Sequence, residues 1–282
     1  MNPVETFYKI LLGRMPVQSE VDNFTEITTL LNEEFIFGAV LSCDFLANAL
    51  ARAPELHLLY VHNARIKMIR TLLPKARIIV DLGGANGSIY EMGYPYRFDR
   101  ITVVDLPSED RCAMYSNIDL ASRQTPNGPI HVWFGSMTDL SNFEDSSADM
   151  VWAGQSIEHI TEEESKIVYD EVMRILKKNG FLCLDTPNRL ITQIHTSTVG
   201  GGFIHPEHKI EYDPWFLRKN LKEAGFTIVE ERGICEMPNT RKTKIFDYSD
   251  FILGNPLPYH VESAYIQFYK CQKLTNIDSV GL

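Results

Sequence analysis

The segment Val80-Asp81-Leu82-Gly83-Gly84-Ala85-Asn86-Gly87 places three glycines and an alanine directly after an apolar run. Residues 77–81 supply that run, and a helix can begin near Ser88. Small residues between a strand and a helix allow a ligand to lie against the backbone N–H groups at the start of the helix. The segment therefore predicts a strand, a tight turn and a helix. A tight turn that holds no ligand would have the same composition.

Further units of the same kind follow along the chain. Apolar runs predict strands at 77–81, 101–105, 150–153, 181–184, 226–229 and 264–270. Between the third and fourth runs, Thr161 and Glu164 form a capping box that predicts a helix, and Gly180 is its expected end. Another helix is expected to begin at Asp213-Pro214 and to end at Gly225. Such alternation predicts an α/β fold with a Rossmann-like, mostly parallel sheet and helices on both faces.

Residues 1–75 have a different pattern, which predicts several helices interrupted near Pro54 and Pro74. The expected organisation is a helical N-terminal extension over residues 1–75, followed by one α/β domain over residues 76–282. Nothing in residues 1–75 has the residue types of a catalytic centre. The sequence does not specify an oligomeric state.

Composition limits the classes of partner and the compartment. The chain of 282 residues has a formal net charge of −10, which disfavours nucleic acid as a partner. No run approaches the ~20 apolar residues that a membrane span needs, and no secretion signal is visible at the N-terminus. The five cysteines are scattered and form no C-x-x-C pair, so reduced thiols are expected. We therefore expect a cytoplasmic protein that acts on a small or neutral substrate.

The chemistry of the glycine turn depends on two carboxylates. The dinucleotide pattern G-x-G-x-x-G does not fit, because Ala85 and Ser88 occupy its second and third glycine positions. Asp81 would repel a pyrophosphate but would attract a ligand that carries an ammonium and a sulfonium. Asp105 ends the next predicted strand, near the interval at which an acid reaches ribose hydroxyls in such folds. The pair predicts a site for a cationic nucleoside, although either acid alone could be a solvated residue at a strand end.

The ordered series of motifs over residues 76–232 resembles class I S-adenosylmethionine-dependent methyltransferases. The segment 81–87 is similar to the first motif of that family, with Ala85 in place of its middle glycine, and residues 155–160 and 171–188 resemble later motifs of its small-molecule branch. The resemblance implies S-adenosyl-L-methionine as the cofactor. It assigns cofactor binding to Asp81, Gly83, Gly84, Ala85, Gly87, Asp105, Leu106, Ser136, Met137 and Gln155.

Methyl transfer to a hydroxyl group requires a base that takes its proton. His159 follows the predicted strand at 150–153, and His208 lies in a long segment that resembles a lid. These two histidines are the candidate catalytic residues, with Glu158 as a residue that could orient either of them. No metal site is expected, because Pro206 disfavours the helical spacing of His205 and His208 and no cysteine cluster assists.

The resemblance implies methyl transfer to a small molecule or a glycan, with O-methylation favoured over N-methylation. Residues 8–16 are also similar to a small helical module of bacterial glycan-related and cell-surface proteins, which favours sugars. One alternative is a protein that binds S-adenosylmethionine without catalysis. A less favoured one is an oxidoreductase with a nucleotide cofactor, which the glycine spacing and Asp81 disfavour.

Overall fold

The structure, a computed structural model, describes residues 57–85, 87–111, 121–198 and 200–274. The chain divides into two units, Met1–Leu56 and His57–Leu282, and the description below concerns the second. The helices predicted before residue 57, and the module-like segment 8–16, lie outside the described residues. Within the described residues, no helix is long and apolar enough to cross a membrane.

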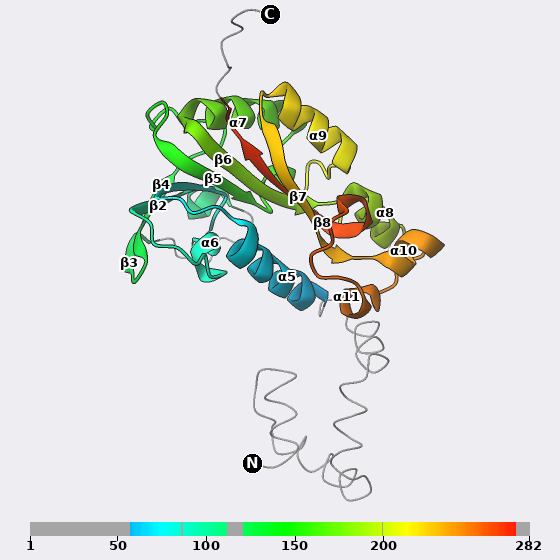
Figure 1. Cartoon of the computed structure of the whole chain (residues 1–282). Coiled ribbons are helices and arrows are strands. Elements are labelled where there is room, and N and C mark those ends of the chain that lie inside the picture. Colours follow the sequence, from blue (N-terminus) through cyan, green and yellow to red (C-terminus); the bar gives the residue numbers. More distant parts are fainter. Residues whose placement is uncertain (1–56, 86, 112–120, 199, 275–282) are drawn as a thin grey trace, which may run out of the picture. The chain divides into compact units, whose positions relative to one another are not determined.

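An eight-stranded sheet forms the centre of the second unit (Figure 1). Its strand order is β3-β4-β2-β1-β5-β6-β8-β7. Strands β4, β2, β1, β5 and β6 are parallel, β8 is antiparallel to both β6 and β7, and β3 is antiparallel to β4. The predicted mostly parallel sheet is confirmed. The bounds are β1 Ile78–Leu82, β2 Arg100–Asp105, β3 Arg123–Thr125, β4 Gly128–Phe134, β5 Ala148–Gly154, β6 Leu176–Pro187, β7 Thr227–Glu236 and β8 Ala264–Gln272.

Helices cover both faces of this sheet. Figure 1 shows α7 and α9 along one face, and α5 and α6 on the other. The helices are α5 His57–Leu72, α6 Ser88–Glu91, α7 Glu162–Ile175, α8 Arg189–Ser197, α9 Pro214–Glu223, α10 Pro238–Thr243 and α11 Asp250–Leu253, with short 3-10 turns η2 Ser108–Asp110, η3 Ile157–His159 and η4 Val261–Ser263. Because α5 belongs to the same unit as the sheet, this unit begins 19 residues before the boundary expected at residue 76.

Local signals explain where α7 and α9 begin. The Thr161 side chain accepts the backbone N–H of Glu164, and the Glu164 carboxylate accepts the N–H of Thr161, as the capping box predicts. Asp213 caps α9 by accepting the N–H of Phe216. The end predicted for α7 at Gly180 is wrong: the helix ends at Ile175, and Leu176 already pairs with Ala148 of β5. Strand pairing, which the local sequence does not reveal, ends this helix early.

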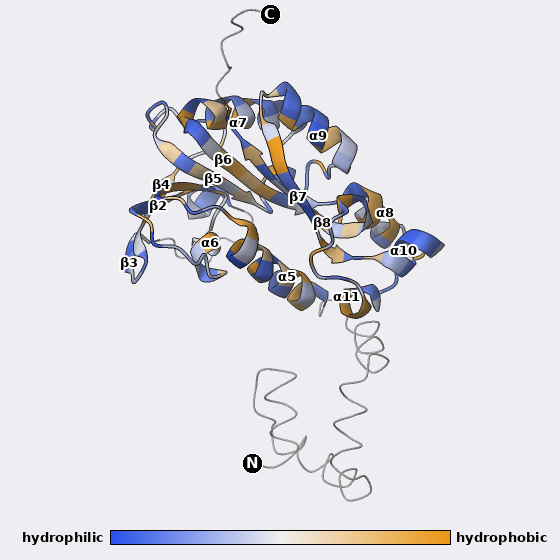
Figure 2. Cartoon of the chain, in the orientation of Figure 1, coloured by the Kyte–Doolittle hydropathy of each residue, from blue (hydrophilic) through white to orange (hydrophobic). Residues whose placement is uncertain are grey.

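The main core lies between the sheet and helices α7 and α9. Its buried side chains include Val151 and Leu182 from the sheet, Val172 from α7, and Leu217 from α9. Figure 2 shows the corresponding hydrophobic colouring on the central strands. The described cysteines, Cys183, Cys235 and Cys271, are free and buried, as expected for reduced thiols. This packing fixes the carboxyl ends of the parallel strands, where the candidate site lies.

Candidate functional site

The order of the strands creates a crevice at the carboxyl end of β1. Strand β1 is flanked by β2 on one side and by β5 on the other, so the segments that follow β1 and β5 leave the sheet at a topological switch point. Gly83 lies at this point with φ 66°, and a Cβ added to it would lie 2.8 Å from the Cβ of Ser156. The close approach of the two segments therefore requires a glycine at position 83.

The predicted glycine turn is present and leads into the short helix α6. Gly87 is the N-cap of α6 in a left-handed conformation, and the N–H of Ser88 donates to the carbonyl of Gly84. Ala85 also has a positive φ of 44°, a conformation that favours glycine. Its backbone N–H donates to Asp105 Oδ2 at 2.8 Å. The turn is thus tied directly to the end of β2.

Asp81 lies completely buried beneath this turn. Neither of its carboxylate oxygens has a hydrogen-bond partner among the described residues, although the backbone of Ile89 lies near. A Cβ added to Gly84 would lie 2.3 Å from the carboxylate carbon of Asp81, so the glycine is needed to accommodate this acid. Burial raises the pKa of Asp81 to about 7, and the nearby charge of Asp105 acts in the same direction. A buried carboxylate without a partner is costly, so its position favours a cationic or hydrogen-bonding ligand at this place.

Other polar atoms near the start of the segment after β5 are also buried without partners among the described residues. These are Ser156 Oγ and Glu158 Oε1. The other oxygen of Glu158, Oε2, accepts the hydroxyl of Thr186 at 2.9 Å. Burial raises the pKa of Glu158 to about 8. Ser156, which lies against Gly83, therefore offers an unsatisfied hydroxyl to a polar ligand in the crevice.

Asp105 ends β2 with its carboxylate only partly exposed. Its Oδ1 accepts the N–H of Leu106 at 2.8 Å and lies 3.7 Å from Nε of Arg111. Burial raises the pKa of this carboxyl, and the backbone N–H groups of Ala85 and Leu106 oppose that rise. Since each carboxylate oxygen has further lone pairs, both can still accept hydroxyl groups of a ligand.

Three apolar or small residues predicted for the cofactor lie around the same crevice. The methyl carbon of Met137 is 3.5 Å from the position of a Cβ added to Gly83. Ser136 hydrogen-bonds the hydroxyl of Thr138 at 2.7 Å, and Leu106 is 40% exposed directly after Asp105. The site can thus present an exposed leucine and a methionine to a planar base.

Arg65 of α5 contacts this edge of the sheet, and the sequence did not predict that contact. Arg65 Nε lies 2.6 Å from Asp185 Oδ2, and its second nitrogen, Nη2, lies 3.1 Å from Oδ1. Asp185, near the end of β6, has a fully buried side chain. Gln155 Nε2 donates to the same carboxylate at 3.4 Å, so a predicted cofactor residue belongs to this network. Only the fold connects positions 65 and 185, and no local signal could have revealed it.

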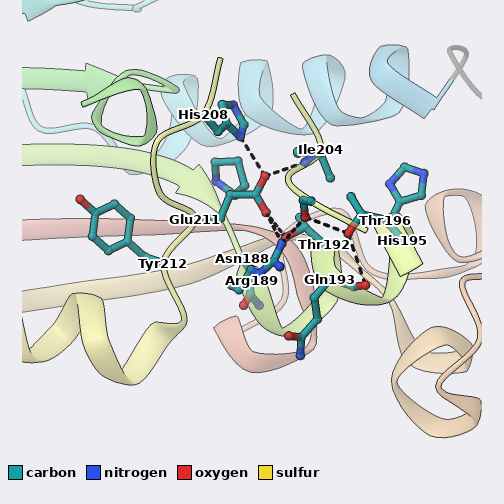
Figure 3. Close-up of polar contacts among 12 residues, drawn as sticks. Asn188, Arg189, Thr192, Gln193, His195, Thr196, Ile204, His208, Glu211 and Tyr212 are labelled. Atoms are coloured by element: carbon teal, nitrogen blue, oxygen red, sulfur yellow. Dashed lines mark hydrogen bonds and ion pairs between the residues drawn. The ribbon is translucent and has the colours of Figure 1, made fainter. Parts of the chain in front are cut away.

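The two candidate catalytic histidines lie together, with a third beside them. The ring centroids of His159 and His208 are 4.9 Å apart, and His205 lies 5.4 Å from His208. His208 shares a 2.8 Å hydrogen bond through Nδ1 with Glu211 Oε1, as Figure 3 shows. Burial lowers the pKa of His159 to about 4, with the nearby His208 and His205 acting in the same direction. The fold therefore assembles three imidazoles where the sequence predicted two separate candidates.

His195, in the segment that resembles a lid, has a structural environment instead. Its ring stacks on Phe246 with centroids 3.9 Å apart. Both ring nitrogens are engaged, Nδ1 with the Tyr265 hydroxyl at 2.9 Å and Nε2 with the Tyr248 hydroxyl at 2.8 Å. This histidine holds α8 against an aromatic group and offers no free nitrogen to a substrate.

Comparisons with known proteins find a methyltransferase match in the part of the chain that forms the glycine turn and the strands around it. A family model described as a methyltransferase domain matches residues 80–184. The uncharacterized methyltransferase YbaJ of Bacillus subtilis is 34% identical over 92 residues, which are 32% of this chain and 35% of YbaJ, so the chain spans about a third of that relative's length.

Two solved structures share the fold at low sequence identity. A Thermotoga maritima structure described as a SAM-dependent methyltransferase, possible histamine N-methyltransferase, has 16% identity and a TM-score of 0.53, covering 82% of this chain and 97% of its own. A Haloferax volcanii complex of the Trm112 methyltransferase activator and a putative methyltransferase matches with 16% identity and a TM-score of 0.52, covering 83% and 96%. Residues 80–184 thus match a methyltransferase domain, and the chain shares its fold with a solved structure described as a SAM-dependent methyltransferase.

Proposed function

We propose that this protein transfers the methyl group of S-adenosyl-L-methionine to a hydroxyl oxygen of a small molecule or a glycan. The observation that carries the proposal is the buried Asp81 carboxylate, which has no hydrogen-bond partner among the described residues beneath the glycine turn. Asp105 lies across that turn and is tied to it through Ala85. A ligand with a positive charge and a ribose would satisfy both acids.

Each predicted residue has a role in this arrangement. Asp105 would accept the ribose hydroxyls, and Asp81 would face the positively charged part of the cofactor. The small residues Gly83, Gly84, Ala85 and Gly87 leave room for close backbone approach, Leu106 and Met137 would pack on the base beside Ser136, and Gln155 would border the methionine part. When bound, the cofactor supplies a methyl carbon that a nucleophile takes as the carbon–sulfur bond breaks.

The histidine cluster supports a hydroxyl acceptor over an amine. A hydroxyl must lose its proton as the new carbon–oxygen bond forms, and an imidazole is a suited base. His208 is oriented by Glu211 through Nδ1, so Nε2 is left to take that proton. His159 would line the acceptor side, whereas the carboxylate of the adjacent Glu158 accepts the hydroxyl of Thr186 rather than hydrogen-bonding either histidine. The module-like segment at residues 8–16 favours a sugar among hydroxyl acceptors.

Asp105→Ala is expected to weaken binding of S-adenosylmethionine by roughly tenfold or more, because charged acceptors make the stronger hydrogen bonds. Asp105→Asn should have a milder effect, since an amide oxygen still accepts. Isothermal titration on folded protein measures both, with the exposed Asp170→Ala on α7 as the control. Wild-type protein should bind the cofactor and not NAD. Unchanged affinity in a folded Asp105→Ala variant would place the nucleoside elsewhere.

His208→Ala is expected to lower turnover at least roughly tenfold while cofactor affinity stays within a few-fold. The assay follows methyl transfer from labelled cofactor to a panel of sugars, phenols and amines. His131→Ala, at an exposed position on β4, is the matched control. Cofactor binding without transfer to any acceptor would favour the non-catalytic alternative, and transfer to amines alone would contradict the hydroxyl assignment.

A further inference from the structure

Three histidines from two separate segments converge beside the crevice. His159 ends η3 after β5, whereas His205 and His208 lie between α8 and α9. One ring nitrogen of each histidine lies within 4.8 Å of the others. We propose that this cluster binds one divalent transition-metal ion of the zinc class, with His159, His205 and His208 as its ligands. The sequence predicted no metal site, because Pro206 disfavours the helical spacing of His205 and His208 and no cysteine cluster assists, whereas the fold brings His159 to the same place.

Backbone hydrogen bonds hold the two segments together at the cluster. The carbonyl of Glu158 accepts the N–H of Lys209 at 2.8 Å and that of Ile210 at 3.3 Å. These contacts lie one residue from His159 and from His208. The relative position of the two ligands is therefore fixed by the main chain before any ion binds, which lowers the cost of assembling the site.

A buried carboxylate, that of Glu211, holds the His208 ring through its Nδ1. Glu211 has a fully buried side chain and accepts the Nδ1 side of His208 at 2.8 Å. The N–H of Ile204 at 2.8 Å and the hydroxyl of Thr192 anchor the same carboxylate (Figure 3). Metal-binding histidines commonly donate their second ring N–H to such a carboxylate, which orients the ring and makes the ligand nitrogen more basic. Nε2 of His208 is thus left for the ion.

His205 contributes an unsatisfied atom to the cluster. Its Nε2 is buried and has no hydrogen-bond partner among the described residues. Its Nδ1 accepts a long 3.3 Å hydrogen bond from the N–H of Glu207, which would be given up when Nε2 binds an ion. Buried polar atoms are rarely left without partners, so this nitrogen points to a ligand.

The donor set selects the kind of ion. Imidazole nitrogens suit zinc and neighbouring first-row ions, whereas magnesium and calcium take oxygen ligands. Zinc–nitrogen bonds of about 2.0–2.1 Å place tetrahedral ligands roughly 3.3 Å apart, so the three rings would rotate inward on binding. Three protein ligands leave the fourth position open for a water or an acceptor oxygen.

The role of this ion in the reaction rests on the proposed function, but the site itself does not. A hydroxyl acceptor bound at the open position would lose its proton to water more readily, because a bound cation stabilises the resulting oxyanion. The ion would then replace His208 as the group that activates the acceptor. Metal content and affinity are measured without any methyl transfer, so failure of one proposal is distinguishable from failure of the other.

Titration of zinc into untagged, full-length protein that has been freed of metal by a chelator tests the site. We expect one ion per chain and, with cobalt, visible absorption typical of tetrahedral nitrogen ligation. His159→Ala and His205→Ala should each lower zinc affinity at least roughly 100-fold, and Glu211→Gln by about 10- to 100-fold. His131→Ala should bind zinc as the wild type does.

Binding of S-adenosylmethionine to His205→Ala should stay within a few-fold of the wild type, which shows that this variant is folded. The proposal is overturned if wild-type protein binds no stoichiometric zinc. It is equally overturned if His205→Ala and His131→Ala bind zinc with the same affinity.

Discussion

Arg65→Met is expected to lower the free energy of unfolding by about 3–5 kcal/mol, the usual cost of removing one partner from a buried ion pair. The guanidinium of Arg65 makes two hydrogen bonds to Asp185, whose side chain has no exposed surface. Without it, Gln155, at 3.4 Å, is the only side chain among the described residues that hydrogen-bonds this carboxylate. The penalty therefore comes from a buried charge that is left without a cation, rather than from the lost contact itself.

Urea denaturation of three variants tests this explanation. Arg77→Met is the matched control, because the ion pair of Arg77 with Asp99 is exposed, with side-chain exposures of 73% and 52%, and such pairs contribute less than about 1 kcal/mol. The double variant Arg65→Met/Asp185→Asn should recover much of the lost stability, since no charge then stays buried. A loss in Arg65→Met no larger than that in Arg77→Met would contradict the assignment.

The fold could be predicted from the sequence to a large extent because its signals are local. The glycine turn at 83–87, the capping box at Thr161 and the N-cap at Asp213 each act within a few residues, and all three occur as expected. The end of α7 was wrong because it depends on pairing between Leu176 and Ala148, which are 28 residues apart in sequence. Contacts of that kind leave no periodic pattern.

The same difference between local signals and long-range contacts decides which residues of the candidate site could be predicted. Asp81 and Asp105 could be proposed from the sequence because each lies at or next to the end of a strand: Asp81 is the last residue but one of β1, before the glycine turn, and Asp105 ends β2 and accepts the N–H of Ala85. Arg65 could not be identified, because its partner Asp185 lies 120 residues further along the chain. The histidine cluster was found only in part, since His159 meets His205 and His208 through tertiary contacts.

Asp81→Asn is expected to stabilise the ligand-free protein increasingly as pH rises, and to weaken cofactor binding at the same time. Burial raises the pKa of Asp81 from 3.8 to about 7 in the folded protein. Between these values the folded state retains a proton that the unfolded state has lost, so this group reduces stability as pH rises from about 4 to about 7. Above pH 7 the penalty is constant, at about 4 kcal/mol for a shift of this size.

An amide does not ionise, so Asp81→Asn lacks this pH-dependent loss. The stability difference between the variant and the wild type should grow by about 2–3 kcal/mol between pH 5 and pH 8. The slope is the informative quantity, because the amide of asparagine is also buried without a partner and shifts the curve by a constant amount. Urea denaturation across this range measures it, with the exposed Asp170→Asn expected to give no slope.

Binding should respond in the opposite direction. The positive charge of the cofactor favours ionised Asp81, so the affinity of the wild type should rise with pH up to about 7, and binding below that pH should release a proton. Asp81→Asn should bind at least roughly tenfold more weakly at pH 8, with little dependence on pH. If Asp81→Asn is more stable than the wild type and also binds the cofactor more weakly, the Asp81 carboxylate contributes to cofactor binding while it destabilises the ligand-free protein. If the variant were less stable at pH 8 than at pH 5 relative to the wild type, Asp81 would have an ionic partner within the protein, and its assignment to the cofactor would be wrong.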